Sequence, residues 1–141
     1  MARLLTHDDD LQALLARTRT IAIVGASARP NRPSHGVMAY LQRAGFRVIP
    51  INPGAAGQMI LGEQVHASLG GVPEPIDMVD VFRRPEDTPS VARDAVAVGA
   101  KSLWLQLGIA NDEAARIAAE GGLDVVMNRC TAIEIGRLKP R

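Results

Sequence analysis

The sequence predicts an α/β fold, a Rossmann-like doubly wound sheet of about five parallel strands with helices on both faces. Short apolar runs that end at Gly, Pro or Asn alternate with helix-like segments, as is typical of βαβ units. Only 3% of the 141 residues are aromatic, and Val, Ile, Leu and Ala fill the apolar runs, which suits a parallel sheet buried on both faces. A chain of this length favours one domain, so we expect a single domain over residues 1–141.

The first helix and the first strand follow from spacing and from a glycine. Thr6 stands three residues before Asp9, which is the spacing of a capping box. The leucines that come next lie on one face of a helix, so we expect a helix over residues 7–18. The apolar run at residues 20–24 predicts the first strand, which ends at Gly25.

The second helix and strand are predicted in the same way. Ser34 is expected to cap a helix that runs to Ala44, and Gly45 is expected to close it. Residues 47–51 predict the second strand. Because Pro50 has no N–H to donate, the N–H side of this strand is expected near the edge of the sheet.

The segment at residues 53–75 is rich in Gly and Pro, and no long regular element fits it. We expect a short edge strand at residues 59–61 and one helical turn at residues 64–69. The alternation then resumes. It predicts strands at residues 77–82, 102–107 and 124–127, and helices at residues 86–98, from the cap Asn111 to Glu120, and at 131–138.

Composition excludes several classes of function. Sixteen Lys and Arg stand against fifteen Asp and Glu, and a net charge of +1 does not suit nonspecific nucleic-acid binding. One cysteine excludes an intrachain disulfide framework and a multi-cysteine zinc site, and it fits a reducing compartment. The first residues contain no long apolar run, so we expect neither a secretory signal nor a membrane span. We therefore expect a cytoplasmic protein with no nucleic-acid or membrane partner.

The fold itself indicates where a ligand would bind. In an open α/β sheet, ligands bind beyond the carboxyl ends of the strands, at the point where the strand order reverses. This rule selects the loops that follow the predicted strands, at residues 25–35, 52–57, 83–85, 108–111 and 128–130.

The loop after the first strand resembles the start of a nucleotide-binding turn. Gly25 permits a tight bend, and the helix that follows would direct free N–H groups toward a phosphate. The dinucleotide fingerprint G-x-G-x-x-G is incomplete, because Ser27 and Pro30 occupy the positions of its second and third glycines. A plain tight turn also explains Gly25, so both interpretations stay open.

The loop after the second strand argues against NAD. An NAD site usually has an Asp or Glu here that accepts from the adenine ribose, whereas this chain has Asn52 followed by Pro53. An adenine nucleotide with additional phosphate charge fits better. NADP would need a nearby cation, for which Arg29, Arg32 or Arg47 are candidates.

Four arginines fall on the predicted ligand side. Arg29 and Arg32 flank the entrance to the second helix, and Arg83 and Arg84 follow the third strand of the main sheet. Guanidinium groups beside a helix N-terminus form a phosphate cradle through charge-assisted hydrogen bonds. The alternative is that all four are solvated loop residues.

Five ordered blocks give the chain a resemblance to a known family. They are Ile-Val-Gly-Ala-Ser (23–27), Arg-Pro-Ser (32–34), Val-Ile-Pro-Ile-Asn-Pro (48–53), Asp-Met-Val-Asp-Val-Phe-Arg (77–83) and Leu-Trp-Leu-Gln-Leu-Gly (103–108). With these blocks, over residues 10–138, the chain resembles the small stand-alone coenzyme A-binding proteins, whose fold is similar to the N-terminal domain of the succinyl-CoA synthetase α subunit.

The resemblance implies that coenzyme A (CoA) is clamped where the strand order reverses. Gly25, Ala26 and Ser27 would bring backbone and hydroxyl donors to phosphate. Arg32 and Ser34 would lie beside them.

The resemblance also implies positions for the rest of the ligand. Asn52 and Pro53 would hold the adenosine end, with Pro53 packed on the ring. The remaining implied contacts are Val81, Phe82 and Arg83 along the other wall, and Leu105 and Gln106 along the route of the pantetheine arm.

The sequence departs from the synthetases, which need a second domain with a phosphorylated histidine and a nucleotide-binding partner subunit. The resemblance therefore implies non-catalytic binding of CoA or acyl-CoA. Two alternatives stay open. One is a small NADP-dependent or nucleotide-transforming enzyme, and the other is a CoA-responsive adaptor that completes a split acyl-CoA ligase. A homodimer or a ligase-like subunit is the protein partner that the sequence leaves open.

Three further residues have a structural and a functional interpretation. Cys130 is expected on the ligand side, either as a small buried apolar residue or as a partner of the CoA thiol in a mixed disulfide, with Arg129 favouring the thiolate. Trp104 is expected in the core. Asp80 is expected to cap a neighbouring loop or helix. The spacing of His and Cys predicts no metal site.

Overall fold

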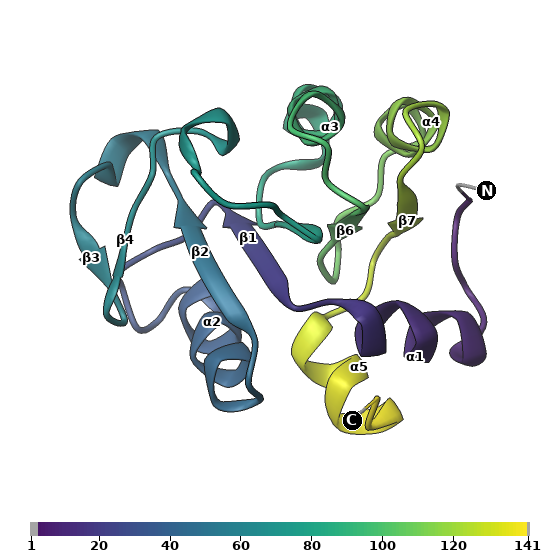
Figure 1. Cartoon of the computed structure of the whole chain (residues 1–141), viewed down its shortest axis with the longest axis horizontal. Helices are drawn as coiled ribbons and strands as arrows, with labels where there is room; N and C mark the ends of the chain where they lie inside the picture. Colours follow the sequence, from purple (N-terminus) through teal and green to yellow (C-terminus); the bar gives the residue numbers. More distant parts are fainter. Residues whose placement is uncertain (1–2, 141) are drawn as a thin grey trace.

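The computed structural model describes residues 3–140 and confirms the Rossmann-like α/β fold (Figure 1). Five parallel strands form one sheet in the order β2-β1-β5-β6-β7. The chain runs from β1 to β2 on one side and then returns to β5 on the other side of β1, so the strand order reverses between β1 and β5. The strands are β1 (Thr20–Val24), β2 (Arg47–Ile51), β5 (Met78–Val81), β6 (Ser102–Leu105) and β7 (Asp124–Val126).

Helices cover both faces of the sheet. Figure 1 shows α3 and α4 on one face and α1, α2 and α5 on the other. These helices are α1 (Asp8–Arg17), α2 (Pro33–Arg43), α3 (Thr88–Ala97), α4 (Asp112–Glu120) and α5 (Thr131–Leu138). The short 3₁₀ turn η3 (Pro85–Asp87) precedes α3, so the predicted helix at residues 86–98 is two elements.

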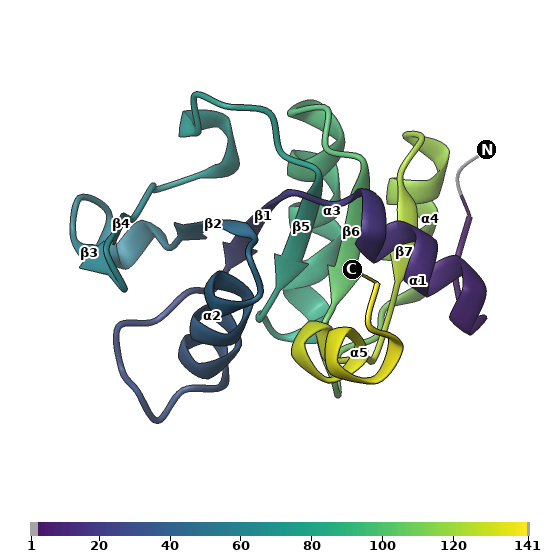
Figure 2. The ribbon, with the colours of Figure 1, turned by 60° about the horizontal axis from the view of Figure 1, so that its bottom comes forward.

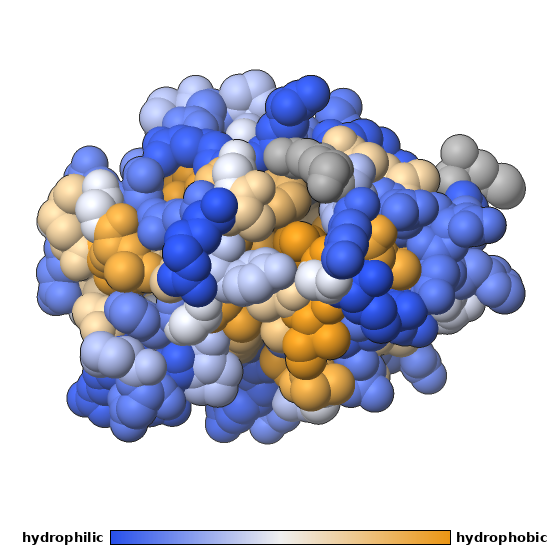
Figure 3. All heavy atoms as spheres, turned by 90° about the horizontal axis from the view of Figure 1, so that it is seen from below, coloured by the Kyte–Doolittle hydropathy of each residue, from blue (hydrophilic) through white to orange (hydrophobic). Residues whose placement is uncertain are grey.

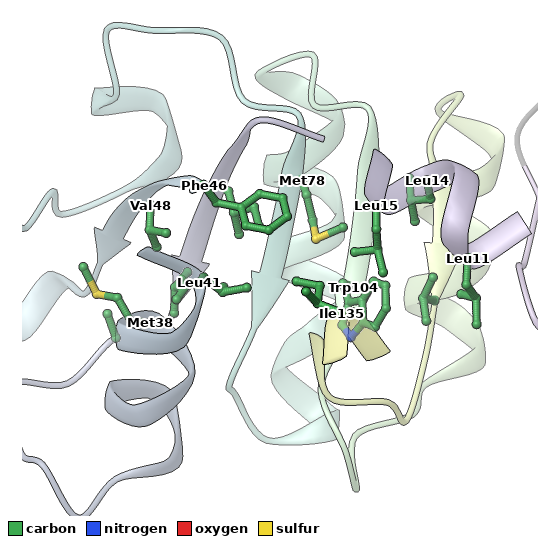
Figure 4. Packing of buried hydrophobic residues seen from close by; sticks show 14 of the residues in the cluster. Leu11, Leu14, Leu15, Met38, Leu41, Phe46, Val48, Met78, Trp104 and Ile135 are labelled. Carbon is green, nitrogen blue, oxygen red and sulfur yellow. The ribbon is translucent and has the colours of Figure 1, made fainter. Parts of the chain in front are cut away.

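The two faces of the sheet have different cores. Large side chains fill the space beneath α1, α2 and α5, where Figure 4 shows leucines of α1 and α2 packed toward the sheet around Phe46, Met78 and Trp104. On the other face, alanines of α3 and α4 let these helices pack closely on the sheet. Trp104 is fully buried, as expected, and its indole Nε1 donates to the carbonyl oxygen of Arg129 at 2.7 Å.

Two predicted N-caps are wrong. The N-cap of α1 is His7, so Thr6 and Asp9 are not in capping-box positions, and neither forms a side-chain cap. Aspartates at the first three helical positions instead oppose the positive end of the helix dipole. The N-cap of α2 is Arg32, because the helix already begins at Pro33, a residue suited to the first helical position. Ser34 is therefore inside the helix rather than its cap.

Other boundary predictions are confirmed. Asn111 caps α4, and its side chain accepts from the N–H of Ala114 at 2.9 Å. Gly45 follows α2 with a φ of +97° and closes it. β2 lies at the edge of the sheet, as Pro50 predicts.

Both edges of the sheet pair with short additional segments. On the outer side of β2, the N–H of His66 donates to the carbonyl of Pro50 at 3.0 Å, and the N–H of Asn52 donates back to His66 at 3.0 Å. On the outer side of β7, Val125 exchanges hydrogen bonds of 2.8–2.9 Å with the backbone of Leu5 and Arg3.

The glycine-rich segment differs from the prediction. β3 (Met59–Ile60) overlaps the predicted strand, but it pairs antiparallel with β4 (Glu63–Gln64) in a separate hairpin. Leu61 and Gly62 both have positive φ, the conformation of a tight two-residue hairpin turn. The helical turn predicted at residues 64–69 is therefore wrong. Two 3₁₀ turns, η1 (Pro53–Ala55) and η2 (Leu69–Gly71), flank the hairpin.

The end of β1 approaches the end of β5 so closely that only glycine fits there. Gly25 has a φ of +91°, and a Cβ at this position would lie 2.5 Å from the carbonyl oxygen of Phe82. We expect Gly25→Ala to lower the free energy of unfolding by about 2–3 kcal/mol, because backbone strain and a backbone clash act together. Chemical denaturation measures this change.

Gly36→Ala is the matched control, since a Cβ at Gly36 in α2 would meet no atom within 4 Å. Replacing a helical glycine by alanine there raises stability by up to about 1 kcal/mol. Equal denaturation midpoints for the two variants would contradict the proposed constraint at Gly25.

Candidate functional site

A cavity of about 560 Å³ lies at the carboxyl ends of the strands, where the strand order reverses. In Figure 2 the loop after β1 and helix α5 lie at this end of the molecule. The loops after β1, β5 and β6 line the cavity together with the first turns of α2 and α5. The lining residues are Gly25, Ser27, Arg32, Pro33, Ser34, Val37, Phe82, Arg83, Gln106, Leu107, Ile109, Cys130 and Ile133.

One end of the cavity is cationic. Arg32 and Arg83 are exposed, and both line it together with Gly25. The Cδ of Arg83 lies 3.3 Å from the point where a Cβ on Gly25 would be, so this side chain extends over the glycine. Arg83 also forms an ion pair of 3.3 Å with Asp87, whereas Arg32 has no ion pair within residues 3–140.

The start of α2 has the features of an anion site. Its N-cap, Arg32, makes no side-chain cap, and no acidic residue occupies the first turn. Ser34 is only 4% exposed, and its hydroxyl makes no hydrogen bond with any residue of the described range. Every fully buried side-chain N or O atom in this range has a hydrogen-bond partner, so the unpartnered Ser34 hydroxyl is not fully buried. Ser34 lines the cavity. The helix dipole and this hydroxyl would both stabilise a bound anion.

The backbone of the first loop is not arranged as the resemblance implies. The N–H groups of Gly25 and Ala26 both donate to the carbonyl of Ile51, at 3.0 and 3.3 Å, so they are not free for a phosphate. The Oγ of Ser27 accepts a hydrogen bond from the N–H of Arg29 at 3.1 Å, so the hydroxyl of Ser27 can still donate its proton to another group. The Ser27 hydroxyl is thus one donor that this loop offers to the cavity.

Asn52 connects two loops instead of facing the cavity. Its Nδ2 donates to the carbonyl of Ala26 at 2.8 Å, and its Oδ1 accepts from the N–H of Gly54 at 2.9 Å. A carboxylate could not donate the first of these bonds. The asparagine that argues against NAD therefore also fixes the loop after β1.

Pro53 lies in a second depression, of about 410 Å³, on the other side of Arg83. Leu69 and Val91 give this depression apolar walls, and Asp87 and Asp94 give it acidic groups. Because Arg83 also lines the main cavity, its side chain belongs to both hollows.

Three of the expected contact residues point into the core. Ala26, Val81 and Leu105 are at most 2% exposed and do not line the cavity. In β5 and β6 the parallel sheet is covered on both faces, so the side chains of these strands are buried and only the residues beyond the strand ends reach the ligand side. Phe82 and Gln106, one residue further along, do line the cavity.

The other end of the cavity is apolar, and sequence reasoning missed most of it. Leu107 and Ile133 are 63% and 56% exposed, and both line the cavity with Val37 and Ile109. Figure 3 shows hydrophobic side chains gathered in the lower middle of one face, between hydrophilic areas. Leu107 was assigned to a strand that in fact ends at Leu105, and Ile133 lies in the turn of α5 that directly follows the ligand-side Cys130.

Cys130 is half-buried and carries a free thiol on the cavity wall. It is therefore not a fully buried apolar residue. The guanidinium of Arg129 pairs with Glu134 at 3.2 Å and donates to the carbonyl of Thr6, so its charge is engaged elsewhere. Arg29 and Arg84 do not line the cavity, and Arg84 pairs with Asp87 at 3.2 Å.

A buried polar group lies behind the cavity wall. Asp80 is fully buried in β5, and its carboxylate accepts from Gln106 Nε2 at 2.6 Å and from Thr131 Oγ1 at 3.1 Å. The expectation that Asp80 caps a loop or helix is wrong, because these partners are side chains. Burial raises the pKa of Asp80 to about 7, and the two hydrogen bonds oppose this rise.

The structure gives no sign of a metal site or a membrane span within residues 3–140. No group of three or more His, Cys, Asp and Glu side chains there could hold a metal ion. No helix in that range is long and apolar enough to cross a membrane.

The raised pKa of Asp80 predicts a pH dependence of stability. The folded pKa of about 7 lies above the usual value of 3.8, so between these values the folded protein holds a proton that the unfolded chain releases. Stability is therefore lost as pH rises through this window. We expect the Tm of Asp80→Asn, relative to the unmodified protein, to increase by about 5 °C from about pH 5 to about pH 8.

Differential scanning calorimetry at a series of pH values checks this expectation. Subtracting the Tm of the unmodified protein from the Tm of Asp80→Asn at each pH removes the contribution of groups that titrate alike in both proteins. Tm curves that stay parallel across the window would show that Asp80 does not titrate there.

A family model, a curated protein and a solved structure each match most of this chain. The family model described as "CoA binding domain" matches residues 19–136. The uncharacterized protein YneT of Bacillus subtilis (strain 168) is 39% identical over 124 residues, which cover 88% of this chain and 90% of YneT. The solved structure of cell-free ID.343 from Thermus thermophilus is 39% identical, with a TM-score of 0.90 over 94% of this chain and 99% of that one.

A larger protein shares part of this fold. The dinucleotide forming Acetyl-coenzyme A synthetase 1 of Ca. Korarchaeum cryptofilum is 26% identical, with a TM-score of 0.69 over 79% of this chain. The match spans only 26% of that synthetase. The family model and the similarity to YneT each cover most of the sequence, and the chain belongs to the family of CoA-binding domains.

Proposed function

We propose that the protein binds coenzyme A or an acyl-CoA in the cavity at the carboxyl end of the sheet, without catalysing a reaction. One observation carries the proposal, namely that a cationic end beside a helix N-terminus continues into an apolar end with a free thiol. The groups of CoA follow the same order, from charged phosphates to a neutral arm that ends in a thiol. Membership in the CoA-binding domain family supports the same ligand.

The pyrophosphate is proposed to lie at the start of α2. Arg32 has no ion pair within residues 3–140 and is available for a phosphate. The hydroxyls of Ser27 and Ser34 would donate to phosphate oxygens, and the helix dipole would favour their charge. In place of the Gly25 and Ala26 N–H groups, these side chains supply the donors.

The adenosine is proposed to lie in the neighbouring depression, where Pro53 forms one wall. Arg83 lies between the two hollows and is the residue that could meet the ribose phosphate of CoA. Binding would exchange its ion pair with Asp87, which is exposed and therefore weak, for a charge-assisted bond to phosphate.

The pantetheine arm is proposed to run past Gln106 toward Cys130, between Leu107 and Ile133. A Cys130 thiolate there could attack the disulfide form of CoA, which would give a mixed disulfide and release one CoA thiol. A reducible gain in the intact mass of the purified protein, absent from Cys130→Ser, would reveal it. The presence of a single cysteine fits a reducing compartment and so agrees with the expected cytoplasmic location.

The likeness to part of a synthetase favours one second candidate. The chain spans about a quarter of the dinucleotide forming Acetyl-coenzyme A synthetase 1, so a separate subunit could supply the remaining domains. In that case the protein would be the CoA-binding subunit of a split acyl-CoA ligase. Co-purification with a nucleotide-binding subunit favours this candidate, and recovery from lysate without such a subunit disfavours it.

Isothermal titration calorimetry with CoA, NADP and NAD tests the proposal directly. We expect CoA to bind more tightly than either dinucleotide, because the cavity offers phosphate donors at one end and an apolar wall at the other. Tighter binding of NADP, together with hydride transfer, would replace the proposal with a small NADP-dependent enzyme. The absence of heat with CoA would refute it.

Arg83→Ala tests the position of the ribose phosphate. We expect the variant to lose about tenfold in affinity for CoA and less for dephospho-CoA, which lacks that phosphate. Arg93→Ala is the matched control, because it removes an exposed guanidinium from α3 that lines neither hollow. Equal losses for the two ligands would place Arg83 at another part of the coenzyme.

A further inference from the structure

Asp80, Gln106 and Thr131 form a closed hydrogen-bonded group behind the cavity wall. They come from β5, from the loop after β6 and from the start of α5, and they are 0%, 3% and 0% exposed. Gln106 alone among the three also lines the cavity. The group therefore connects a buried carboxylate to one polar side chain on the cavity surface.

The geometry fixes the orientation of the Gln106 amide. Its Nε2 donates to Asp80 Oδ1 at 2.6 Å and to Thr131 Oγ1 at 2.9 Å, so both N–H groups are used. Thr131 Oγ1 donates in turn to the other carboxylate oxygen of Asp80 at 3.1 Å. When Asp80 is ionised, the reversed amide would bring Oε1 against a carboxylate oxygen, and two acceptors at this distance repel each other.

The carbonyl oxygen of the same amide is left for the cavity. Oε1 of Gln106 has no hydrogen-bond partner in the described part of the chain. No fully buried side-chain N or O atom there lacks a partner, so Oε1 is accessible even though Gln106 is almost completely buried. The cavity wall thus presents one hydrogen-bond acceptor of fixed direction.

We propose that Asp80 and Thr131 are positioning residues that hold Gln106 Oε1 toward the cavity, where it accepts a hydrogen bond from the thiol-bearing arm of the bound coenzyme. This inference rests on the proposed function. The arm carries two kinds of donor, its amide N–H groups and its terminal S–H, and either would satisfy Oε1.

The same acceptor sets the direction in which the ligand lies. Phosphate oxygens are acceptors, and Gln106 Oε1 would repel them, whereas Arg32 and Arg83 attract them. Leu107, Ile109 and Ile133 surround the Gln106 end with apolar surface, which disfavours charge further. Phosphates are thus directed to the arginine end and the neutral arm to the glutamine end.

The test uses two variants at residue 131, one without a hydroxyl and one with it. Thr131→Val removes one of the two hydrogen bonds that hold the Gln106 amide, so Oε1 is held less firmly toward the cavity, and Thr131→Ser restores that hydrogen bond. Calorimetry at about pH 8.5, where Asp80 is ionised, measures the affinity for CoA and for adenosine 3′,5′-bisphosphate, which has no arm. A reductant in the buffer keeps Cys130 from forming a disulfide with the ligand.

We expect Thr131→Val to lower the affinity for CoA about fivefold and to leave the affinity for adenosine 3′,5′-bisphosphate unchanged. We expect Thr131→Ser to restore the affinity for CoA. A purely structural role would weaken both ligands alike, so equal losses, or none, would overturn the inference. If the unmodified protein bound no CoA, the proposed function itself would fail. Should Thr131→Val not fold, Asp80→Asn gives the same comparison, because asparagine hydrogen-bonds the amide in either orientation.

Acetyl-CoA, which lacks the S–H, identifies the donor. If Thr131→Val lowers the affinity for acetyl-CoA as much as the affinity for CoA, an amide N–H of the arm donates to Gln106 Oε1. If acetyl-CoA is insensitive to the substitution while CoA is weakened, the terminal thiol is the donor. Either result supports the acceptor role and locates the end of the arm relative to Cys130.

Discussion

The close approach of β1 and β5 at Gly25 is the constraint on which the site depends. A side chain at this position would meet the carbonyl of Phe82, so the two strand ends can lie together only because residue 25 has no Cβ. The carbonyl of Ile51 and the amide of Asn52 then hold the loop in place from the side of β2. The cavity is hollowed beyond this junction, and Arg83 extends over it.

The start of α2 shows how a binding site differs from a stable helix end. Asn111 caps α4 with its side chain, and α1 begins with three aspartates, whereas α2 begins with an arginine, a proline and an unpartnered serine hydroxyl. Arg32 places positive charge at the positive end of the helix dipole, an unfavourable arrangement in the empty protein. A bound anion would reverse that effect. Without a ligand, the start of α2 therefore lacks the stabilisation that the starts of α1 and α4 have, and it is here that ligand charge is expected.

Local signals were enough to predict the sheet, but not the details of the site. β1 and β2 were predicted to the residue, because apolar runs bounded by glycine and asparagine define them. Ser34 was misassigned as a cap because Pro33 already begins the helix. The loss of the Gly25 and Ala26 donors depends on the register of β2, and the grouping of Asp80, Gln106 and Thr131 depends on three distant segments. Such contacts between segments leave no local pattern in the sequence.

The closed borders of the sheet limit how two copies of this chain could associate. Beside β2, Pro50 lacks an N–H and its carbonyl is occupied by His66, and beside β7 the backbone of Val125 is occupied by residues 3–5. Strand addition requires a row of unsatisfied main-chain groups. These flanking segments therefore hinder the merging of two sheets into one continuous ten-stranded layer, whereas association through helical or side-chain surfaces would leave them in place.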